Sequence, residues 1–277
     1  MPDYSNNKTK PLVSIIMNCY NGEKFLSQSL KSIKLQTYRN WELIFWDNKS
    51  TDNSEKIIKN YSDKRIRFFK SKKFLNLYNA RNLAIKKARG KYISFLDVDD
   101  LWKKDKLQKQ VSFLKQNKDF KIVYSNFITL DEIKNKKYIY HKNSLPSGYI
   151  TQQLLNNYQI GILTVMLERK LFNNQKFNNN YNIIGDFDFF LKLSKNYKFG
   201  CIQEYLASYR LHSSNYSQKK LNDYIREIKN WISQNQKRMN KLSFSITPVK
   251  QMLIKLKIKY YLNLCISSAI FLYPSIL

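Results

Sequence analysis

The chain has 277 residues, which is long enough to bury one large core or two small ones. Hydrophobic residues make up 43% and aromatic residues 15%, a composition that excludes a disordered protein and favours a globular one. Its 49 Lys and Arg against 20 Asp and Glu give a formal charge of +29. Three explanations stay open: a nucleic-acid partner, an anionic membrane surface, or lysines spread over the whole surface. The lysines are distributed along the chain rather than massed in one block, which supports the third.

The cysteines and the N-terminal residues indicate the cellular compartment of the protein. Cys19, Cys201 and Cys265 lie far apart and are odd in number, which indicates a reducing compartment and no disulfide framework. No Cys/His cluster has the spacing of a zinc site. We expect Met1–Lys10 to be a disordered, polar lead-in and not a signal peptide.

Strand-like and helix-like patterns alternate along the first part of the chain. Short apolar runs predict strands at 12–17, 41–46, 65–69 and 92–96, and helical spacing predicts helices at 23–35, around 57–58, at 80–88 and at 101–114. Asp52 with Glu55 resembles a capping pair for the second helix. This alternation predicts an α/β fold with a doubly wound, mainly parallel sheet.

The middle of the chain continues with shorter elements. We expect strands at 121–125, 164–168 and 201–210, a polar hairpin or loop at 131–141, a helix near 152–156, an Asn-rich loop at 173–182 and a helix from about Asp186.

The composition changes from Leu221. Residues 221–242 predict a long polar helix, and after Glu227 the chain has eight Lys or Arg and no acidic side chain. Residues 254–259 alternate apolar residues with lysine, a period that favours neither a helix nor a simple amphipathic anchor. Residues 260–277 carry no charged side chain but include Asn263 and Pro274, so a membrane span is disfavoured. We expect one domain at 1–220 and a helical, basic and apolar tail at 221–277 that lies on a membrane surface or docks on its own domain.

Carboxylates follow two of the predicted strands. The second strand ends in Asp47, and the fourth ends in Asp97, followed by Asp99 and Asp100. Ligands of open α/β sheets bind beyond the carboxyl ends of the strands, and hard oxygen ligands there suit Mg²⁺ or Mn²⁺ shared with a phosphate. The alternative is that Asp99 or Asp100 only caps the next helix, which would leave the pair Asp97 and Asp99 unexplained.

A second acidic group, Asp186 and Asp188, opens a predicted helix. Acidic side chains in a first turn interact favourably with the helix dipole, so a structural role for either residue is an alternative to a catalytic one.

Together these motifs resemble a family 2 glycosyltransferase with the A-type nucleotide-sugar fold, over residues 12–217. The segments that carry the resemblance are, in chain order, Val13 to Ile16 with Tyr20-Asn21-Gly22, Gln36 to Ile44 with Trp46 to Ser54, Ala80-Arg-Asn82 with Gly90, Phe95 to Trp102 with Lys106-Leu107, Gly185 to Asp188, and Tyr209 to His212 with Asn215 and Ser217. Each segment is weak alone, but their order is specific. The C-terminal tail is not covered.

The resemblance implies an inverting enzyme that uses a nucleoside diphosphate sugar. It implies that Asp186 is the general base and that Asp99 and His212 hold Mn²⁺ or Mg²⁺. A lone histidine is often structural, and that alternative for His212 stays open. The residues implied to bind the donor nucleotide are Tyr20, Asn21, Asp47, Arg81, Asp97, Val98 and Arg210, with Asp47 on the base, Asp97 on the ribose or base side and Arg210 near the diphosphate.

These residue types suit the reaction. A bound divalent cation offsets the charge that develops on a diphosphate leaving group. Inversion by single displacement needs one base, and such a base contributes about 10²–10⁴-fold. A retaining mechanism with two carboxylates is compatible with the residue types, but the resemblance argues against it.

The chain departs from the family pattern at three positions. Asn18 stands where proline is frequent, Asn48 where a second aspartate is common, and Gly185 where glutamate often precedes the base. Asn48 and Gly185 keep an inactive homologue open as an alternative.

The expected reaction transfers a hexose, from a UDP-sugar, to a hydroxyl of a saccharide or polyprenyl-linked glycan during bacterial surface polysaccharide synthesis. We expect peripheral membrane contact at the cytoplasmic face of the inner membrane. One alternative is a sugar-nucleotide nucleotidyltransferase, which would want a Gly-rich phosphate loop after the first strand, where 18–24 has one glycine. The other is a nucleic-acid-binding protein, indicated only by the charge; the acids at the strand ends argue against it, so no nucleic-acid partner is expected.

Overall fold

The computed structural model describes residues 10–139, 141, 143–215 and 220–272, with side chains up to 263. Residues 1–9 of the expected lead-in and the end of the uncharged C-terminal stretch lie outside this part. The chain forms two compact units: the first contains residues up to Ile150 and Gln159–His212, and the second contains Thr151–Tyr158 and residues from Ser213 onward. Cys19 and Cys201 carry free thiols.

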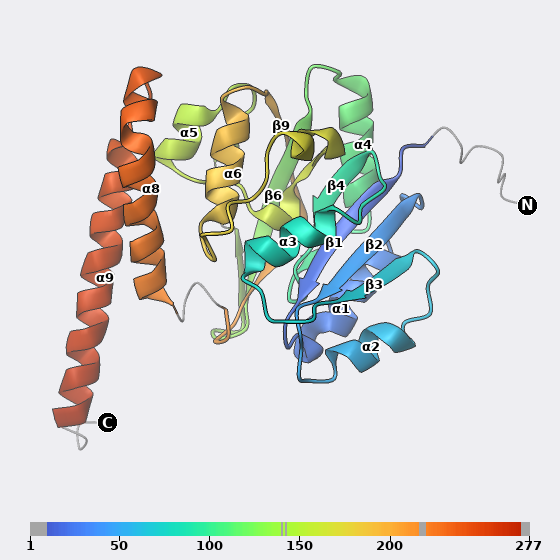
Figure 1. Ribbon diagram of the computed structural model, residues 1–277, viewed down its shortest axis with the longest axis horizontal. Coiled ribbons are helices and arrows are strands. Elements are labelled where there is room, and N and C mark those ends of the chain that lie inside the picture. Colours follow the sequence, from blue (N-terminus) through green and yellow to red (C-terminus); the bar gives the residue numbers. More distant parts are fainter. Residues whose placement is uncertain (1–9, 140, 142, 216–219, 273–277) are drawn as a thin grey trace, which may run out of the picture. The chain divides into compact units, whose positions relative to one another are not determined.

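The elements follow the predicted order except at residues 101–102, where a strand replaces the start of a predicted helix (Figure 1). The first unit contains β1 (Val13–Cys19), α1 (Glu23–Lys34), β2 (Trp41–Asp47), α2 (Ser54–Asn60), β3 (Ile66–Lys70), α3 (Leu77–Ile85), β4 (Tyr92–Phe95), β5 (Leu101–Trp102), α4 (Lys106–Gln116), β6 (Ile122–Asp131), β7 (Lys136–Ile139), η2 (Ile162–Thr164), β8 (Met166–Glu168), η3 (Arg169–Asn173), α6 (Gly185–Ser194) and β9 (Phe199–Leu211). The second unit contains α5 (Thr151–Asn156), α8 (Leu221–Lys241) and α9 (Thr247–Leu272).

One sheet forms the centre of the first unit, with the strand order β3-β2-β1-β4-β8-β6-β9-β5 and with β7 paired to β6. Strands β3, β2, β1 and β4 are parallel. Beyond β4 the sheet is mixed, because β8 runs antiparallel to both β4 and β6 while β6 and β9 are parallel. The α/β class is therefore confirmed, and the strands that precede Asp47 and Asp97 belong to the parallel half.

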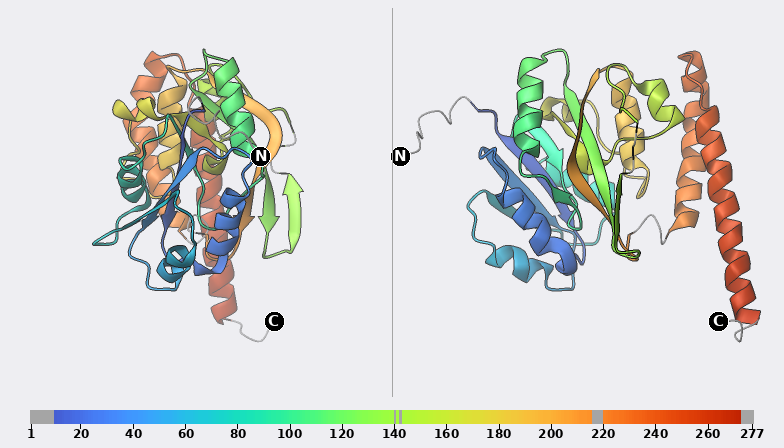
Figure 2. Two further views of the ribbon diagram at one scale, coloured as in Figure 1. Left: turned by 90° about the vertical axis from the view of Figure 1, so that its right-hand side faces the viewer. Right: turned by 180° about the vertical axis from the view of Figure 1, so that it is seen from behind.

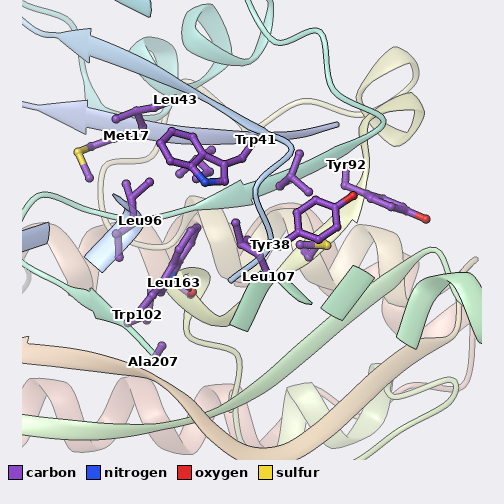
Figure 3. Close-up of a cluster of buried hydrophobic side chains, with 14 of the residues drawn as sticks. Met17, Tyr38, Trp41, Leu43, Tyr92, Leu96, Trp102, Leu107, Leu163 and Ala207 are labelled. Carbon is purple, nitrogen blue, oxygen red and sulfur yellow. Dashed lines mark hydrogen bonds between the residues drawn. The ribbon is translucent and has the colours of Figure 1, made fainter. Parts of the chain in front are cut away.

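Helices cover both faces of the sheet. Figure 1 shows α3 in front of the parallel strands, and α1 lies in front of them when the molecule is seen from behind in Figure 2. Every residue of β1 and β2 is buried, as expected for central parallel strands with helices on both sides. Figure 3 shows the core on the α1 side, where Met17 from β1 and Leu96 after β4 share one cluster with Trp102. This core therefore joins the strand ends that carry the acidic residues.

The helix predicted at 101–114 is wrong at its start. Leu101 and Trp102 form β5, which pairs with Ser208 and Ala207 of β9. The Trp102 indole is buried and its Nε1 donates a hydrogen bond to the carbonyl of Leu163 at 2.8 Å. The helix begins only at Lys106. Burial of the indole and pairing with a distant strand override the local helical pattern.

Two helix starts also differ from the prediction. Asp52 and Glu55 do not form a capping pair: Asp52 accepts from the N–H groups of Ser54 at 3.0 Å and Glu23 at 2.9 Å, and Glu55 forms ion pairs with Lys59 and Lys70.

Helix α3 begins at Leu77 rather than Ala80. The side chain of Asn76 accepts a hydrogen bond from the N–H of Asn79 at 2.8 Å, which starts the helix one turn earlier.

The segment 254–259 is helical, contrary to the expectation from its alternating pattern. It lies within α9, which packs against α8 in the second unit. Two residues correspond to about 200° around a helix, so alternating apolar residues fall on opposite faces. Leu256 and Tyr260 are half-buried, whereas Ile254 and Ile258 are 57% and 54% exposed. Helix α9 therefore has two apolar faces. Of the described helices, none combines the length and apolar character needed to cross a membrane.

Candidate active site

The loops after β1 and β2 are tied together by Asn21. The last residues of the two strands, Cys19 and Asp47, lie side by side in register. Asn21 has a positive φ of 53°, and its Oδ1 accepts from the N–H of Thr51 at 2.8 Å. Its own N–H donates to Ser50 Oγ at 3.0 Å. Asparagine tolerates this left-handed conformation. Asn21 therefore joins the loop after β1 to the loop after β2 and sets the backbone path there.

Asp47 and Asn48 occupy the end of β2. Asp47 is fully buried, and both of its carboxylate oxygens lie 3.3 Å from the N–H of Ser50. The Asn48 amide donates to the carbonyl of Leu75 at 2.8 Å and accepts from the N–H of Leu75 at 3.1 Å. An aspartate could accept but not donate here. The departure from the family pattern at position 48 therefore has a structural reason.

An exposed aromatic pair joins the loop after β1 to the loop after β3. Tyr20 and Phe74 are 52% and 57% exposed, and their rings meet edge to face with centroids 4.7 Å apart. Sequence reasoning selected Tyr20 but missed Phe74, because nothing in the loop after β3 marks it. Two exposed aromatic rings form a surface on which a planar base can stack.

A buried arginine, Arg81, pairs with Asp97, whose side chain is 33% exposed at the end of β4. Arg81 is 2% exposed, and its Nη2 donates to Asp97 Oδ1 at 2.8 Å. Burial raises the pKa of Asp97 and the neighbouring charge of Asp99 raises it further, while Arg81 opposes both effects. The two predicted donor-binding residues are thus joined to each other.

Val98 and Gly22 bring the loops after β4 and β1 into contact. A Cβ atom on Gly22 would lie 2.8 Å from Val98 Cγ2, so only glycine allows this approach. Ser29 Oγ of α1 lies 2.7 Å from the carbonyls of both Val98 and Asp100 and can donate to either. Helix α1 therefore fixes the backbone of the Asp-Val-Asp turn.

Asp99 and His212 come together although 113 residues separate them. His212 Nε2 lies 3.0 Å from Asp99 Oδ2, and the side chains are 13% and 25% exposed. Within the part of the chain that the structure describes, no three acidic, histidine or cysteine side chains are grouped as ligands of one metal ion. Asp99 and His212 nevertheless fit a metal ion that is shared with a substrate, because Mg²⁺ and Mn²⁺ are commonly held by one or two side chains together with phosphate oxygens.

Arg210 of β9 contacts the backbone of the same Asp-Val-Asp turn. Its Nε donates to the carbonyl of Asp99 at 2.9 Å, its Nη2 donates to Gln28 at 2.8 Å, and its Nη1 pairs with Glu132. The guanidinium also lies over the ring of Phe25, 4.4 Å from the centroid. The geometry places Arg210 beside the expected metal ligand, in contact with its backbone.

Asp100 is not a helix cap. It is 2% exposed and accepts the N–H of Arg210 at 2.9 Å, while Asp105 is the residue that precedes α4. Burial, together with the charges of Asp99 and Asp97, raises the pKa of Asp100 well above its usual range. The capping alternative for Asp99 and Asp100 is therefore wrong.

Asp186 lies in the first turn of α6. Its Oδ1 accepts from the N–H of Phe187 at 2.8 Å and lies 3.2 Å from the hydroxyl of Tyr78. Tyr78 in turn lies beneath the Arg81 guanidinium, 5.4 Å from ring centroid to Cζ. A chain of contacts thus links Asp186 to the Arg81–Asp97 pair. Asp188 pairs instead with Lys192 at 2.6 Å.

The model of the glycosyl transferase family 2 matches residues 14–190. The chain is 41% identical over 162 residues to the UDP-Glc:alpha-D-GlcNAc-diphosphoundecaprenol beta-1,3-glucosyltransferase WfgD of Escherichia coli, and the match covers 58% of this chain and 62% of that relative. The chain thus spans less than two thirds of that relative's length.

The similar solved structures include a complex with a nucleotide and a complex with a nucleotide sugar. S. aureus TarS 1-349 in complex with UDP has a TM-score of 0.61 at 19% identity, covering 79% of this chain and 65% of that chain. The mannosyltransferase PcManGT from Pyrobaculum calidifontis, in complex with GDP-Man and Mn²⁺, has a TM-score of 0.60 at 14% identity, covering 90% and 69%. At these identities the two structures show a shared fold.

Proposed function

The chain belongs to glycosyl transferase family 2, and we propose that it is an inverting glycosyltransferase that moves a sugar from a nucleoside diphosphate to an acceptor hydroxyl. The observation that carries this proposal is the meeting of Asp99 and His212 beyond β4, with their side chains 3.0 Å apart. Asp99 follows β4 and His212 follows β9, so both lie beyond the carboxyl ends of strands, where open α/β sheets bind ligands.

Asp99 and His212 would hold Mn²⁺ or Mg²⁺, and the mixed carboxylate and imidazole set favours Mn²⁺. When bound, the ion supplies positive charge to the diphosphate leaving group. Arg210 supports this pair, since its Nε holds the Asp99 carbonyl. The Mn²⁺ bound to PcManGT supports the proposal.

The donor nucleotide would lie along the loops after β1, β2 and β4. Tyr20 offers an exposed ring to the base. The resemblance assigns Asp47 to the base as well, and in this structure its carboxylate is buried and lies 3.3 Å from the backbone nitrogen of Ser50. Asn21 shapes the loop and Val98 fixes the turn next to the ribose, where Asp97 is held by Arg81.

Asp186 would act as the general base. As the acceptor oxygen forms its bond to the anomeric carbon, its proton passes to the Asp186 carboxylate. The bond from the anomeric carbon to the diphosphate oxygen breaks, and its electron pair leaves with the diphosphate. One carboxylate on the face opposite the leaving group is sufficient for this inversion.

We propose UDP-sugars as donors, with a hexose as the transferred group, and a saccharide or polyprenyl-linked glycan as acceptor in bacterial surface polysaccharide synthesis. Two findings support this choice. The name of the relative in Escherichia coli gives a UDP-Glc donor and a diphosphoundecaprenol-linked acceptor, and TarS binds UDP.

We also propose peripheral contact with an anionic membrane, at the cytoplasmic face, through the exposed apolar face of α9. Ile254, Ile258, Tyr261 and Leu262 are each more than half exposed on this helix. Exposed lysines at 255, 257 and 259 flank them, and α9 has no acidic residue. Apolar insertion with flanking positive charge is the usual mode of such binding. A second copy of the chain would bring lysines against lysines, which disfavours self-association here.

The experiment that tests the proposed function is calorimetric binding of UDP and GDP, each in Mn²⁺ and in EDTA. Metal-dependent UDP binding supports the site and the donor class. Preference for GDP keeps the enzyme class and overturns the donor. Absence of binding by either nucleotide contradicts the proposed function.

A further inference from the structure

Gly185, immediately before the proposed base, lies against the ring of Tyr78. A Cβ atom at position 185 would lie 2.4 Å from both Cδ2 and Cε2 of that ring, a distance that real Cβ atoms do not show. Tyr78 is 2% exposed, and its ring stacks on Phe177 with the centroids 5.3 Å apart. The ring cannot move away easily, so the tyrosine at position 78 requires a glycine at position 185.

The hydroxyl of Tyr78 reaches the proposed base. It lies 3.2 Å from Asp186 Oδ1 and 3.1 Å from the carbonyl of Ile183, so its one hydrogen is shared between these acceptors. The same Oδ1 accepts the N–H of Phe187. Two donors from different elements, α3 and α6, thus converge on one carboxylate oxygen and restrain its position.

The phenol stays a donor under all working conditions. Burial raises the pKa of Tyr78 well above its usual value, and the charge of Asp186 adds to this effect. The Arg81 guanidinium on the ring acts in the opposite direction, and Arg81 is itself paired with Asp97.

We propose that Tyr78 is the positioning residue of the general base, because its hydroxyl orients the Asp186 carboxylate. The ring of Tyr78 occupies the space that a side chain at position 185 would otherwise fill. This inference rests on the proposed function, in which Asp186 takes the acceptor proton. It explains why the chain tolerates glycine before the base, because the missing side chain is replaced from α3.

The test is Tyr78→Phe, which removes one oxygen and keeps the ring. Because a hydrogen bond to a charged group is lost, kcat should fall by about 10- to 100-fold. The dissociation constant of UDP in Mn²⁺ and the KM of the donor should stay within about twofold of the wild-type values, because the phenol contacts the general base Asp186 and not the nucleotide.

The matched control is Tyr124→Phe. Tyr124 is fully buried, and its hydroxyl donates to the carbonyl of Pro146 at 2.6 Å. This variant also loses a buried phenol hydrogen bond, but its kcat should equal that of the wild type. Thermal unfolding of both variants shows whether their stabilities are comparable.

A double-mutant cycle tests the second half of the inference. Gly185→Ala should lower kcat in the wild-type background, because the new methyl group displaces the Tyr78 ring. In the Tyr78→Ala background the same change should have little further effect, because the ring is gone.

Unchanged kcat in Tyr78→Phe, or an equal loss in Tyr124→Phe, would overturn the positioning role and leave the proposed function in place. Failure of the wild type to bind either nucleotide or to transfer sugar would overturn the proposed function itself. The two failures are therefore distinguishable.

Discussion

At the scale of single residues, the hydrogen-bonding groups of a side chain explain why this chain departs from the pattern it resembles. Asn48 both donates to and accepts from the backbone of Leu75. Gly185 leaves room for the ring of Tyr78. Both departures are accommodated by specific contacts in the fold, so neither is by itself a sign of lost activity.

Asp99→Ala should abolish the metal-dependent part of donor binding, because it removes the carboxylate that meets His212. We expect UDP affinity in Mn²⁺ to fall to the level measured in EDTA. Asp119→Ala is a suitable control, since the Asp119 side chain is 77% exposed and pairs with Lys198 only at 3.6 Å. Retained Mn²⁺-dependent affinity in Asp99→Ala would remove Asp99 from the metal site.

Asp186→Asn should separate binding from chemistry. The amide preserves the shape of the side chain but cannot accept the proton of the acceptor hydroxyl. We expect UDP binding to be unchanged while the transfer rate falls by about 10²–10⁴-fold. Turnover at the wild-type rate would mean that another residue is the base.

At the scale of elements, the Asp-Val-Asp turn is held by two elements distant in sequence. Ser29 of α1 holds the carbonyls of the turn, and Arg210 of β9 holds the carbonyl of Asp99. Strand β5 brings the turn next to β9 by pairing with it. The turn that carries Asp99 is therefore held by contacts from a helix and a strand and not by loops alone.

A second network joins the parallel strands at their other end. Glu42 of β2 accepts hydrogen bonds from Ser14 Oγ at 2.6 Å, from Arg67 Nη1 at 2.7 Å and from the N–H of Arg89 at 2.7 Å. Burial alone would raise the pKa of Glu42, but these hydrogen bonds outweigh it and lower the pKa. A lowered folded pKa means that this stabilisation is present above the unfolded pKa and is lost as the pH falls through the folded pKa.

Glu42→Gln should therefore lower the free energy of unfolding by about 2–3 kcal/mol at pH 7, because an ionised acceptor is lost from a buried network. Urea denaturation at pH 7, 5 and 3 measures the difference from the wild type, which should shrink in acid. The control Glu204→Gln removes an exposed carboxylate that pairs with Lys109, and should cost less than about 1 kcal/mol. A difference that stays constant down to pH 3 would contradict the assignment.

At the scale of the whole molecule, the chain combines a unit that carries the proposed donor site with a helical unit that has an exposed apolar face. Ile254→Asp with Ile258→Asp should weaken co-sedimentation with phosphatidylglycerol vesicles by at least about tenfold, because two apolar side chains no longer insert. Ile133→Asp is the control, since Ile133 is 59% exposed in the first unit.

Salt should weaken the vesicle binding of the wild type, because the lysines of α9 act through screened charges. Equal sedimentation of the double variant and the wild type would show that this face does not meet the membrane.

The sequence by itself determined the α/β class, the strands β1, β2 and β4 and the acidic residues that follow them, because buried strands are continuous apolar runs and their ends are marked locally. The alternation of strands and helices was sufficient to place Asp47 and Asp97 at one edge. The resemblance also predicted that Asp99 and His212 share one site, and the structure brings their side chains to 3.0 Å. Only the tertiary structure decided that Leu101 and Trp102 form a strand and that Tyr78 meets Asp186 and Gly185. These contacts join residues about a hundred positions apart, and their geometry depends on packing that no local pattern contains.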